Sequence, residues 1–375
     1  MDEYFSGSFK DIRWYFVQIE QSFFTIFVRL YASIDQEDDQ KQAIMSFLDL
    51  TSWIHHQTTT LLTYTLFGTR PSPPCYPRGA ILVTGANSVL GSKLCQSLLS
   101  RGYIVFGGSS SENMQTSQNG TWIPLILDVT LPLSIERAHQ IVSRRLSGQP
   151  LIGIVHCAED TWIGPLESCP LEDLNRVFQI NTLGPLQVTR AFMGMLRESQ
   201  GRVVLLGSAA GWLSAPLNAP FAASKLVFLW LIHIEALESL ADSLRVELCQ
   251  WNISVSLIEL GMLELDGLPL GSTDTNVHVS TMDQVMRLPQ TLPSPLIKLY
   301  APLISSISQI LQDTRPNATG PAIRTLIHAL TSARPRTRYI VGWDARAARI
   351  LRDWVPDRVL DGMYVSLMGK IGEER

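Results

Sequence analysis

Six short runs of apolar, β-forming residues constrain the fold of this chain more than any other feature. Within each run the residues are mostly apolar and do not alternate with polar ones. Such runs are typical of strands covered on both faces, and therefore of a parallel sheet. The runs are AILVTG (80–85), YIVFGG (103–108), IPLILDV (123–129), LIGIVHC (151–157), GRVVLLGS (201–208) and NISVSLIELG (252–261).

Helical stretches lie between these runs. One is SKLCQSLLSRG, where Gly102 marks the expected C-terminal stop, and another is residues 172–196. Strands that alternate with helices indicate βαβ units. The sequence therefore predicts an α/β fold with a Rossmann-like, doubly wound parallel sheet, which a last apolar strand at 338–342 would complete.

A proline-rich segment, GTRPSPPCYPRG (68–79), separates this pattern from what precedes it. Its prolines cannot sustain a helix or a central strand, so it is interpreted as a linker. We expect three parts: a helical N-terminal extension with its linker (1–79), the Rossmann-like domain (80–345) and a helical C-terminal tail (346–375).

Composition excludes several classes of protein. The chain is 46% hydrophobic and 17% charged, with a net charge of −4 and no long basic block, so a nucleic-acid partner is not expected. The cysteines are few, odd in number and scattered, which argues against a disulfide framework or a metal site. They stand at positions 75, 95, 157, 169 and 249.

Location follows from the same observations. Reduced thiols predict an intracellular protein, and the acidic start MDEYFSGSFKD is unlike a secretory signal. The sequence has no stretch of 18 or more uncharged apolar residues, so a membrane-spanning helix is not expected. The aromatic segment 12–34 is broken by charges and leaves two interpretations open, a helix buried on more than one side or one lying on a membrane surface. The expected location is cytoplasmic or peripheral to a membrane.

The first predicted strand runs directly into TGANSVLGSKL (84–94). A glycine-bearing turn between a strand and its helix is where backbone N–H groups and a helix N-terminus can face a dinucleotide pyrophosphate. Further polar residues follow at or after the ends of later strands or lie within helices. They are Asp128 in LDV, Asn181 in NTLG, Ser208 in GSAAG and Lys225 in FAASK.

In the order and spacing of these motifs, residues 79–345 resemble the short-chain dehydrogenase/reductase family. Residues 164–196 and 333–346 are similar to the branch that acts on retinol-like and steroid-like alcohols. The resemblance implies hydride exchange between NAD or NADP and a lipophilic alcohol or ketone. It also implies a possible homodimer, since the helix after Lys225 pairs subunits in many relatives.

The resemblance assigns roles residue by residue. Asn181 would anchor a water relay, Ser208 would orient the carbonyl oxygen, and Lys225 would hold the nicotinamide ribose and lower the pKa of a neighbouring phenol. The family's tyrosine, four residues before the lysine, is Phe221 here, which has no ionisable proton. Cofactor contacts would come from Gly85, Asn87, Val89, Gly91, Asp128, Ala158, Lys225 and Gly261.

Three further departures from the family pattern accompany Phe221. Val89 replaces the middle glycine of the turn and is expected to crowd the pyrophosphate. The family's NNAG is His156-Cys157-Ala158-Glu159, which places a glutamate near the expected cofactor, and its PG is Leu260-Gly261. His156 leaves two interpretations open, a substitute proton donor or a hydrogen-bonded residue at a strand end.

Two features stay undecided by the sequence. The end of the second strand, GGSSSEN (107–113), has neither an acid nor an arginine directly at the position that selects NAD or NADP, and Glu112 lies too far along. About nine apolar residues (226–234) follow Lys225 where the family has none. They are interpreted as a widened core, a subunit interface or a translated intron.

Three hypotheses follow from these observations. In the first, the chain keeps the dinucleotide-binding fold and has lost proton transfer through Phe221. In the second, it is a working oxidoreductase whose proton comes from water ordered by Ser208 and Lys225. In the third, it is an interaction module that binds no nucleotide. Val89 and Glu159 support this hypothesis, because neither side chain favours a bound dinucleotide. Nucleotide binding separates the third from the others, and turnover separates the first two.

Overall fold

A computed structural model describes residues 74–76, 78–111, 121–225, 236–263, 281–314 and 316–373. By their internal contacts, residues Met1–Arg70 and Pro71–Arg375 form two units. The expectations for residues 1–68, for the segment 12–34, for Glu112 and for the apolar residues 226–234 lie outside the described residues.

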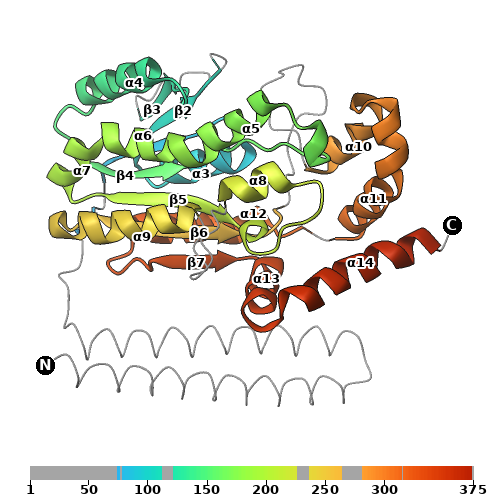
Figure 1. Cartoon of the computed structure of the whole chain (residues 1–375). Helices are drawn as coiled ribbons and strands as arrows, with labels where there is room; N and C mark the ends of the chain where they lie inside the picture. Colours follow the sequence, from blue (N-terminus) through green and yellow to red (C-terminus); the bar gives the residue numbers. More distant parts are fainter. Residues whose placement is uncertain are drawn as a thin grey trace, which may run out of the picture. The chain divides into compact units, whose positions relative to one another are not determined.

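Seven parallel strands form one sheet in the order β3-β2-β1-β4-β5-β6-β7 (Figure 1). This order confirms the predicted doubly wound sheet, because it reverses between β1 and β4 and creates a switch point there. Pro124 lies in β3 at the edge of the sheet, the position that a strand proline tolerates. The strands are β1 (Ala80–Thr84), β2 (Ile104–Ser109), β3 (Trp122–Ile126), β4 (Leu151–His156), β5 (Arg202–Ser208), β6 (Ser254–Leu260) and β7 (Arg338–Val341).

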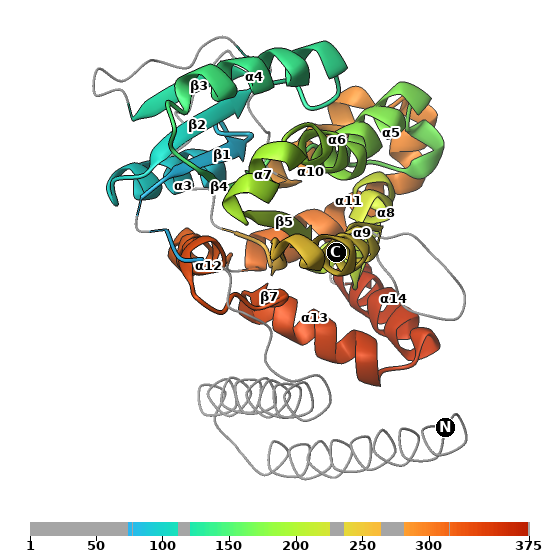
Figure 2. The same cartoon turned by 90° about the vertical axis from the view of Figure 1, so that its left-hand side faces the viewer.

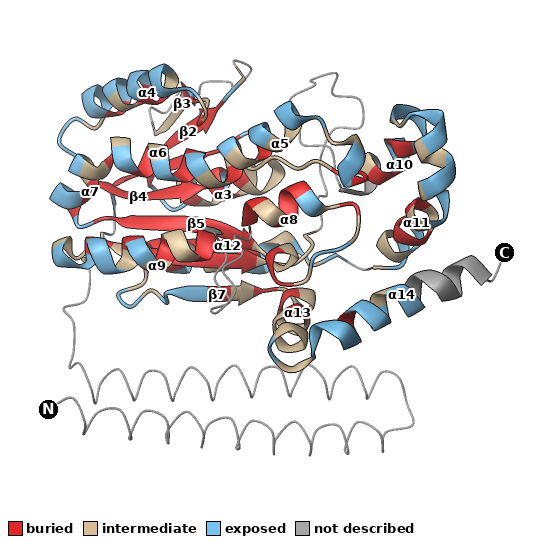
Figure 3. Cartoon of the chain, viewed as in Figure 1, coloured by how far each residue is buried: buried red, intermediate tan, exposed pale blue. Residues whose placement is uncertain are grey.

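Helices cover both faces of the sheet (Figure 2), which explains why the strands are apolar throughout. On one face lie α4 (Pro132–Arg145), α6 (Gly184–Ala191), α7 (Met193–Ser199) and α9 (Ala236–Leu248). On the other face lie α3 (Val89–Leu99) and α12 (Thr319–Thr331). Buried residues run the length of β4 and β5 between these layers (Figure 3).

The remaining helices lie around one end and one edge of the sheet. Helices α10 (Thr281–Thr291) and α11 (Ser294–Asp313) share a separate small core with Ile163 and Leu217. Helix α5 (Leu171–Phe178) leads into α6, and α8 (Ala219–Lys225) follows β5. Helices α13 (Trp343–Trp354) and α14 (Asp357–Glu373) form the C-terminal part, so α13 runs across residue 345, where we expected a boundary.

Candidate active site

The turn between β1 and α3 requires both of its glycines. Gly85 has a positive φ of 63°, and a Cβ there would lie 2.6 Å from the backbone nitrogen of Ala158. A Cβ on Gly91 would lie 2.2 Å from the carbonyl oxygen of Gly85. The Ala158 N–H donates to Thr84 Oγ1 at 3.2 Å, which fixes the loop after β4 against this turn.

Val89 is the first residue of α3 and is half-buried, and Asn87 is exposed beside it. Ser88 caps the helix, its Oγ accepting a hydrogen bond from the Gly91 N–H at 3.0 Å. Valine at position 89 is therefore compatible with the capped turn and the start of α3. The helix N-terminus, with its positive dipole end, lies at the carboxyl edge of the sheet.

Asn181 lies in a π-helical turn, Gln179–Leu183, between α5 and α6. Its amide nitrogen donates to the Asp160 carbonyl oxygen and to Ser224 Oγ, both at 2.8 Å, and its Oδ1 accepts from the Asp160 N–H at 2.8 Å. The buried side chain thus ties the loop after β4 to α8. π-Helical turns are frequent at functional sites.

Ser208 ends β5, and its Oγ accepts a hydrogen bond from the Ala210 N–H at 3.2 Å. This leaves the hydroxyl hydrogen of Ser208 for another acceptor. Phe221 lies on α8, which packs against the short turn Ala209–Gly211 after Ser208. The residue is buried, with 8% of its surface exposed.

Lys225 is buried, with 2% of its surface exposed. Its Nζ donates to the Leu206 carbonyl oxygen at 3.1 Å and forms an ion pair with Glu159 Oε2 at 3.0 Å. The same Nζ lies 5.6 Å from the centroid of the Phe221 ring. The ammonium therefore faces a carboxylate, a carbonyl oxygen and an aromatic ring at once.

The pairing of Glu159 with Lys225 was not anticipated from the sequence, which predicted only an unfavourable charge near the cofactor. The Glu159 side chain is 37% exposed and approaches Lys225 from the loop after β4. Neighbouring Asp160 pairs instead with Arg176 at 2.7 Å. The available signal was the acid itself, which stands after β4 at a position where the family has glycine.

His156 is the buried residue at the end of β4. Its Nε2 lies 2.9 Å from Thr189 Oγ1, and burial lowers its pKa to about 3. At neutral pH the imidazole is uncharged and enclosed in the protein. It belongs to the packing between β4 and α6 rather than to the group of Ser208, Phe221 and Lys225.

Asp128 and Gly261 lie at the same edge of the sheet, after β3 and β6. Asp128 Oδ1 accepts hydrogen bonds from the N–H and the hydroxyl of Thr130, at 2.9 and 2.7 Å. A Cβ on Gly261 would lie 1.8 Å from Asp344 Oδ1, so this glycine is required by the carboxylate beside it. The structure thus places all of the predicted cofactor residues at the carboxyl edge.

Among the residues described between 74 and 373, no group of three or more histidine, cysteine or acidic side chains is arranged to hold a metal ion. In the same ranges, no helix combines the length and the apolar character needed to cross a bilayer.

Comparison with known proteins finds similarity to retinol dehydrogenases and to a reductase. Mouse retinol dehydrogenase 5 is 29% identical over 297 residues, covering 77% of this chain and 88% of its own length. Rat retinol dehydrogenase 16 is 28% identical, covering 76% and 87%. An NADPH-dependent 3-dehydrocapnine reductase from Ornithobacterium rhinotracheale is 23% identical, covering 78% and 98%. The two retinol dehydrogenases support the resemblance to the retinol and steroid branch.

Solved structures share the fold. A short-chain dehydrogenase from Streptomyces avermitilis has a TM-score of 0.57 and 22% identity, covering 79% of this chain and 95% of its own. One from Burkholderia cenocepacia, in complex with NADP, has a TM-score of 0.53 and 18% identity, covering 77% and 97%. The sequence profile described as short chain dehydrogenase matches residues 79–268, more than half of the chain. The chain therefore belongs to the short-chain dehydrogenase family.

Proposed function

We propose that this chain binds a nicotinamide dinucleotide on its short-chain dehydrogenase fold but transfers protons poorly, so that any oxidoreduction of an alcohol or ketone is slow. One observation carries the proposal. The side chain that faces Lys225 Nζ from the tyrosine position is the Phe221 ring, 5.6 Å away, which has no proton to give. The proton donor of the family's reaction is thus missing where it is needed.

The residues present fit the cofactor in part. Gly85 and Gly91 keep the turn close to the N-terminus of α3, which suits an anionic phosphate. Lys225, in contrast, already has Glu159 as a partner, so gripping a ribose hydroxyl requires Nζ to share or exchange that contact. A bound nicotinamide would supply the hydride, while Ser208 would hold the substrate oxygen through its hydroxyl hydrogen.

The substrate class rests on the relatives. The retinol dehydrogenases to which this chain is similar support a lipophilic alcohol or ketone, and the relative that is named as NADPH-dependent, together with the NADP complex, supports NAD or NADP as the cofactor. A homodimer and contact of residues 12–34 with a membrane surface stay predictions from the sequence.

A second candidate function is a working oxidoreductase with another proton route. It is favoured by Glu159, an ionisable group that is more than a third exposed and reaches Lys225 at 3.0 Å. A carboxylate there, with Ser208 and an ordered water, would offer a path for a proton that bypasses Phe221.

The two candidates differ in turnover at equal nucleotide binding. We suggest titrating the purified protein with NADH and NADPH by nicotinamide fluorescence, then assaying it with retinoid, steroid and short-chain alcohols and ketones. Binding without measurable turnover supports the proposal. Binding with rapid turnover refutes it in favour of the second candidate, and absence of binding at millimolar nucleotide refutes both.

A further inference from the structure

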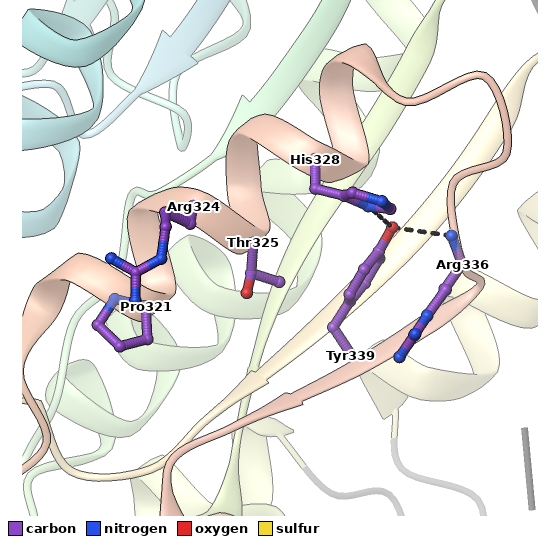
Figure 4. A pocket seen from close by; sticks show the side chains of 6 residues that line it. All are labelled: Pro321, Arg324, Thr325, His328, Arg336 and Tyr339. Carbon is purple, nitrogen blue, oxygen red and sulfur yellow. Dashed lines mark hydrogen bonds between the residues drawn. The ribbon is translucent and has the colours of Figure 1, made fainter. Parts of the chain in front are cut away.

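A hollow of about 340 Å³ lies between α12 and β7, away from the candidate active site. Arg336 and Tyr339 line it from the amino end of β7, whereas the site residues follow the carboxyl ends of the strands. In the view of Figure 4, Arg324 lies on one side of Thr325 and Tyr339, and Arg336 lies on the other. The lining consists of Pro321, Arg324, Thr325, His328, Arg336 and Tyr339.

The lining carries positive charge without a compensating acid. It includes two guanidinium groups and an imidazole, and no aspartate or glutamate. Within the described part of the chain, neither Arg324 nor Arg336 forms an ion pair. Arginines without partners beside a hydroxyl and an imidazole give a surface that favours an anion.

The wall of the hollow is held by Tyr339, whose side chain is largely buried. Its hydroxyl oxygen accepts from the Arg336 N–H at 2.8 Å and lies 2.9 Å from His328 Nδ1. When the Tyr339 hydroxyl donates its hydrogen bond to Nδ1 of the neutral His328 imidazole, the ring carries its own proton on Nε2. Nε2 is then a further donor, in addition to the two guanidinium groups and the Thr325 hydroxyl.

A buried charge behind the hollow adds to the positive potential. Arg202 is 2% exposed, and its guanidinium donates to the carbonyl oxygens of Ala329 and Pro74, at 3.1 and 3.3 Å, rather than to a carboxylate. The pKa of His328 is lowered first by burial and then by the charges of Arg336 and Arg202. The arginines that line the hollow and the buried Arg202 therefore both make this region positive.

We propose that this hollow is a binding site for a phosphate group, carried either by a small soluble molecule or by a phospholipid. The planar guanidinium groups of Arg324 and Arg336 match pairs of phosphate oxygens, and the Thr325 hydroxyl and the His328 imidazole offer further donors. The proposal is independent of catalysis at Lys225, which lies on α8.

The test is calorimetric titration of the full chain with inorganic phosphate and with pyrophosphate, at fixed ionic strength. Arg324→Gln and Arg336→Gln are each expected to weaken binding about tenfold, because each removes a charge-assisted hydrogen bond. Arg358→Gln, which removes the same charge from an exposed position on α14, is the matched control and is expected to bind like the wild type.

A second arm identifies the source of the phosphate. Sedimentation with phosphatidylcholine vesicles, with and without phosphatidic acid, is compared for the wild type and the Arg324→Gln/Arg336→Gln double variant. Binding that needs phosphatidic acid and both arginines assigns the site to a headgroup. Binding of soluble phosphate alone, lost in the double variant, assigns it to a small molecule.

Two results would overturn the proposal. One is that the wild type binds neither the soluble phosphates nor the acidic vesicles. The other is that the double variant binds as well as the wild type, which would place any phosphate elsewhere, for example at the N-terminus of α3. NADPH titration of the double variant is expected to match the wild type, because neither arginine belongs to the dinucleotide turn between β1 and α3.

Discussion

Lys225 contacts two residues at which this chain departs from its family, Phe221 and Glu159. An ammonium that is 2% exposed needs compensation for lost hydration, and it receives a carboxylate from Glu159 and a carbonyl oxygen from Leu206. The Phe221 ring offers its face at 5.6 Å. The lysine is therefore stabilised without any tyrosine hydroxyl, so loss of the phenol does not leave its charge without partners.

Replacing Glu159 tests this stabilisation. Glu159→Gln is expected to lower the free energy of unfolding by about 1 kcal/mol, less than for a fully buried pair because the carboxylate is partly solvated. Urea denaturation at pH 7 measures the change. Glu172→Gln, at an exposed position on α5, is the control for loss of a negative charge. Equal stability of Glu159→Gln and wild type would show that the ion pair contributes nothing.

The buried His156 predicts a dependence of stability on pH. Its pKa is about 3 in the folded state and near 6.5 when unfolded, so the unfolded chain binds the extra proton between these values. The contribution is complete above pH 6.5 and is lost as pH falls, by up to about 1.4 kcal/mol per pH unit.

Denaturation at pH 7 and pH 5 measures this loss. The change for the wild type is expected to exceed the change for His156→Gln, which keeps a polar partner for Thr189 but does not titrate. The same pH dependence in both proteins would mean that the loss comes from other groups.

At the scale of single elements, the turn before α3 shows how closely the backbone is packed. A Cβ on Gly91 would lie 2.2 Å from a backbone oxygen of Gly85, and backbone cannot move as a side chain can. Gly194, on α7, offers a contrast, since a Cβ there would meet nothing within 4 Å.

Alanine at these two positions is expected to act in opposite directions. Gly91→Ala should destabilise the fold by more than about 2 kcal/mol through overpacking, and should weaken NADPH binding. Gly194→Ala should stabilise it by roughly 0.5–1 kcal/mol, because alanine favours helices over glycine. Thermal unfolding measures both, and a neutral Gly91→Ala would show that the turn is looser than the structure indicates.

The elements themselves were predictable from the sequence, because uninterrupted apolar runs leave few alternatives to strands of a doubly wound sheet. Motif spacing in the sequence also pointed to Asn181, Ser208 and Phe221 as candidate site residues. The Glu159–Lys225 pair was not predictable, since it depends on the direction of two side chains 66 residues apart. The hollow between α12 and β7 was not predictable either, because only the fold brings Arg324 and Arg336 to the same surface.

At the scale of the whole chain, the segment before β1 is tied to the Rossmann-like domain. The Tyr76 hydroxyl donates to the Ser199 carbonyl oxygen at 2.7 Å, and Arg202 donates to the Pro74 carbonyl oxygen at 3.3 Å. Internal contacts assign the residues from Pro71 onward to one unit. The proline-rich segment therefore contributes to the domain through its last residues.

Two truncated chains test this assignment. A chain that begins at Pro71 is expected to unfold cooperatively by circular dichroism. A chain that begins at Ala80 is expected to be less stable by about 1–3 kcal/mol, because it leaves the buried Arg202 without one acceptor and removes Tyr76. Equal stability of the two would show that residues 71–79 play no part in the domain.

The proposal that Phe221 deprives the chain of the family's proton donor is tested most directly by restoring a phenol at this position. Phe221→Tyr is expected to bind NADPH as the wild type does and to raise turnover of a retinoid or steroid ketone by roughly 10²–10⁴. Phe221→Leu, which changes the ring without adding a hydroxyl, is expected to leave turnover unchanged. A Phe221→Tyr variant that binds NADPH normally yet turns over no faster than Phe221→Leu would contradict the claim that the missing hydroxyl at position 221 limits turnover.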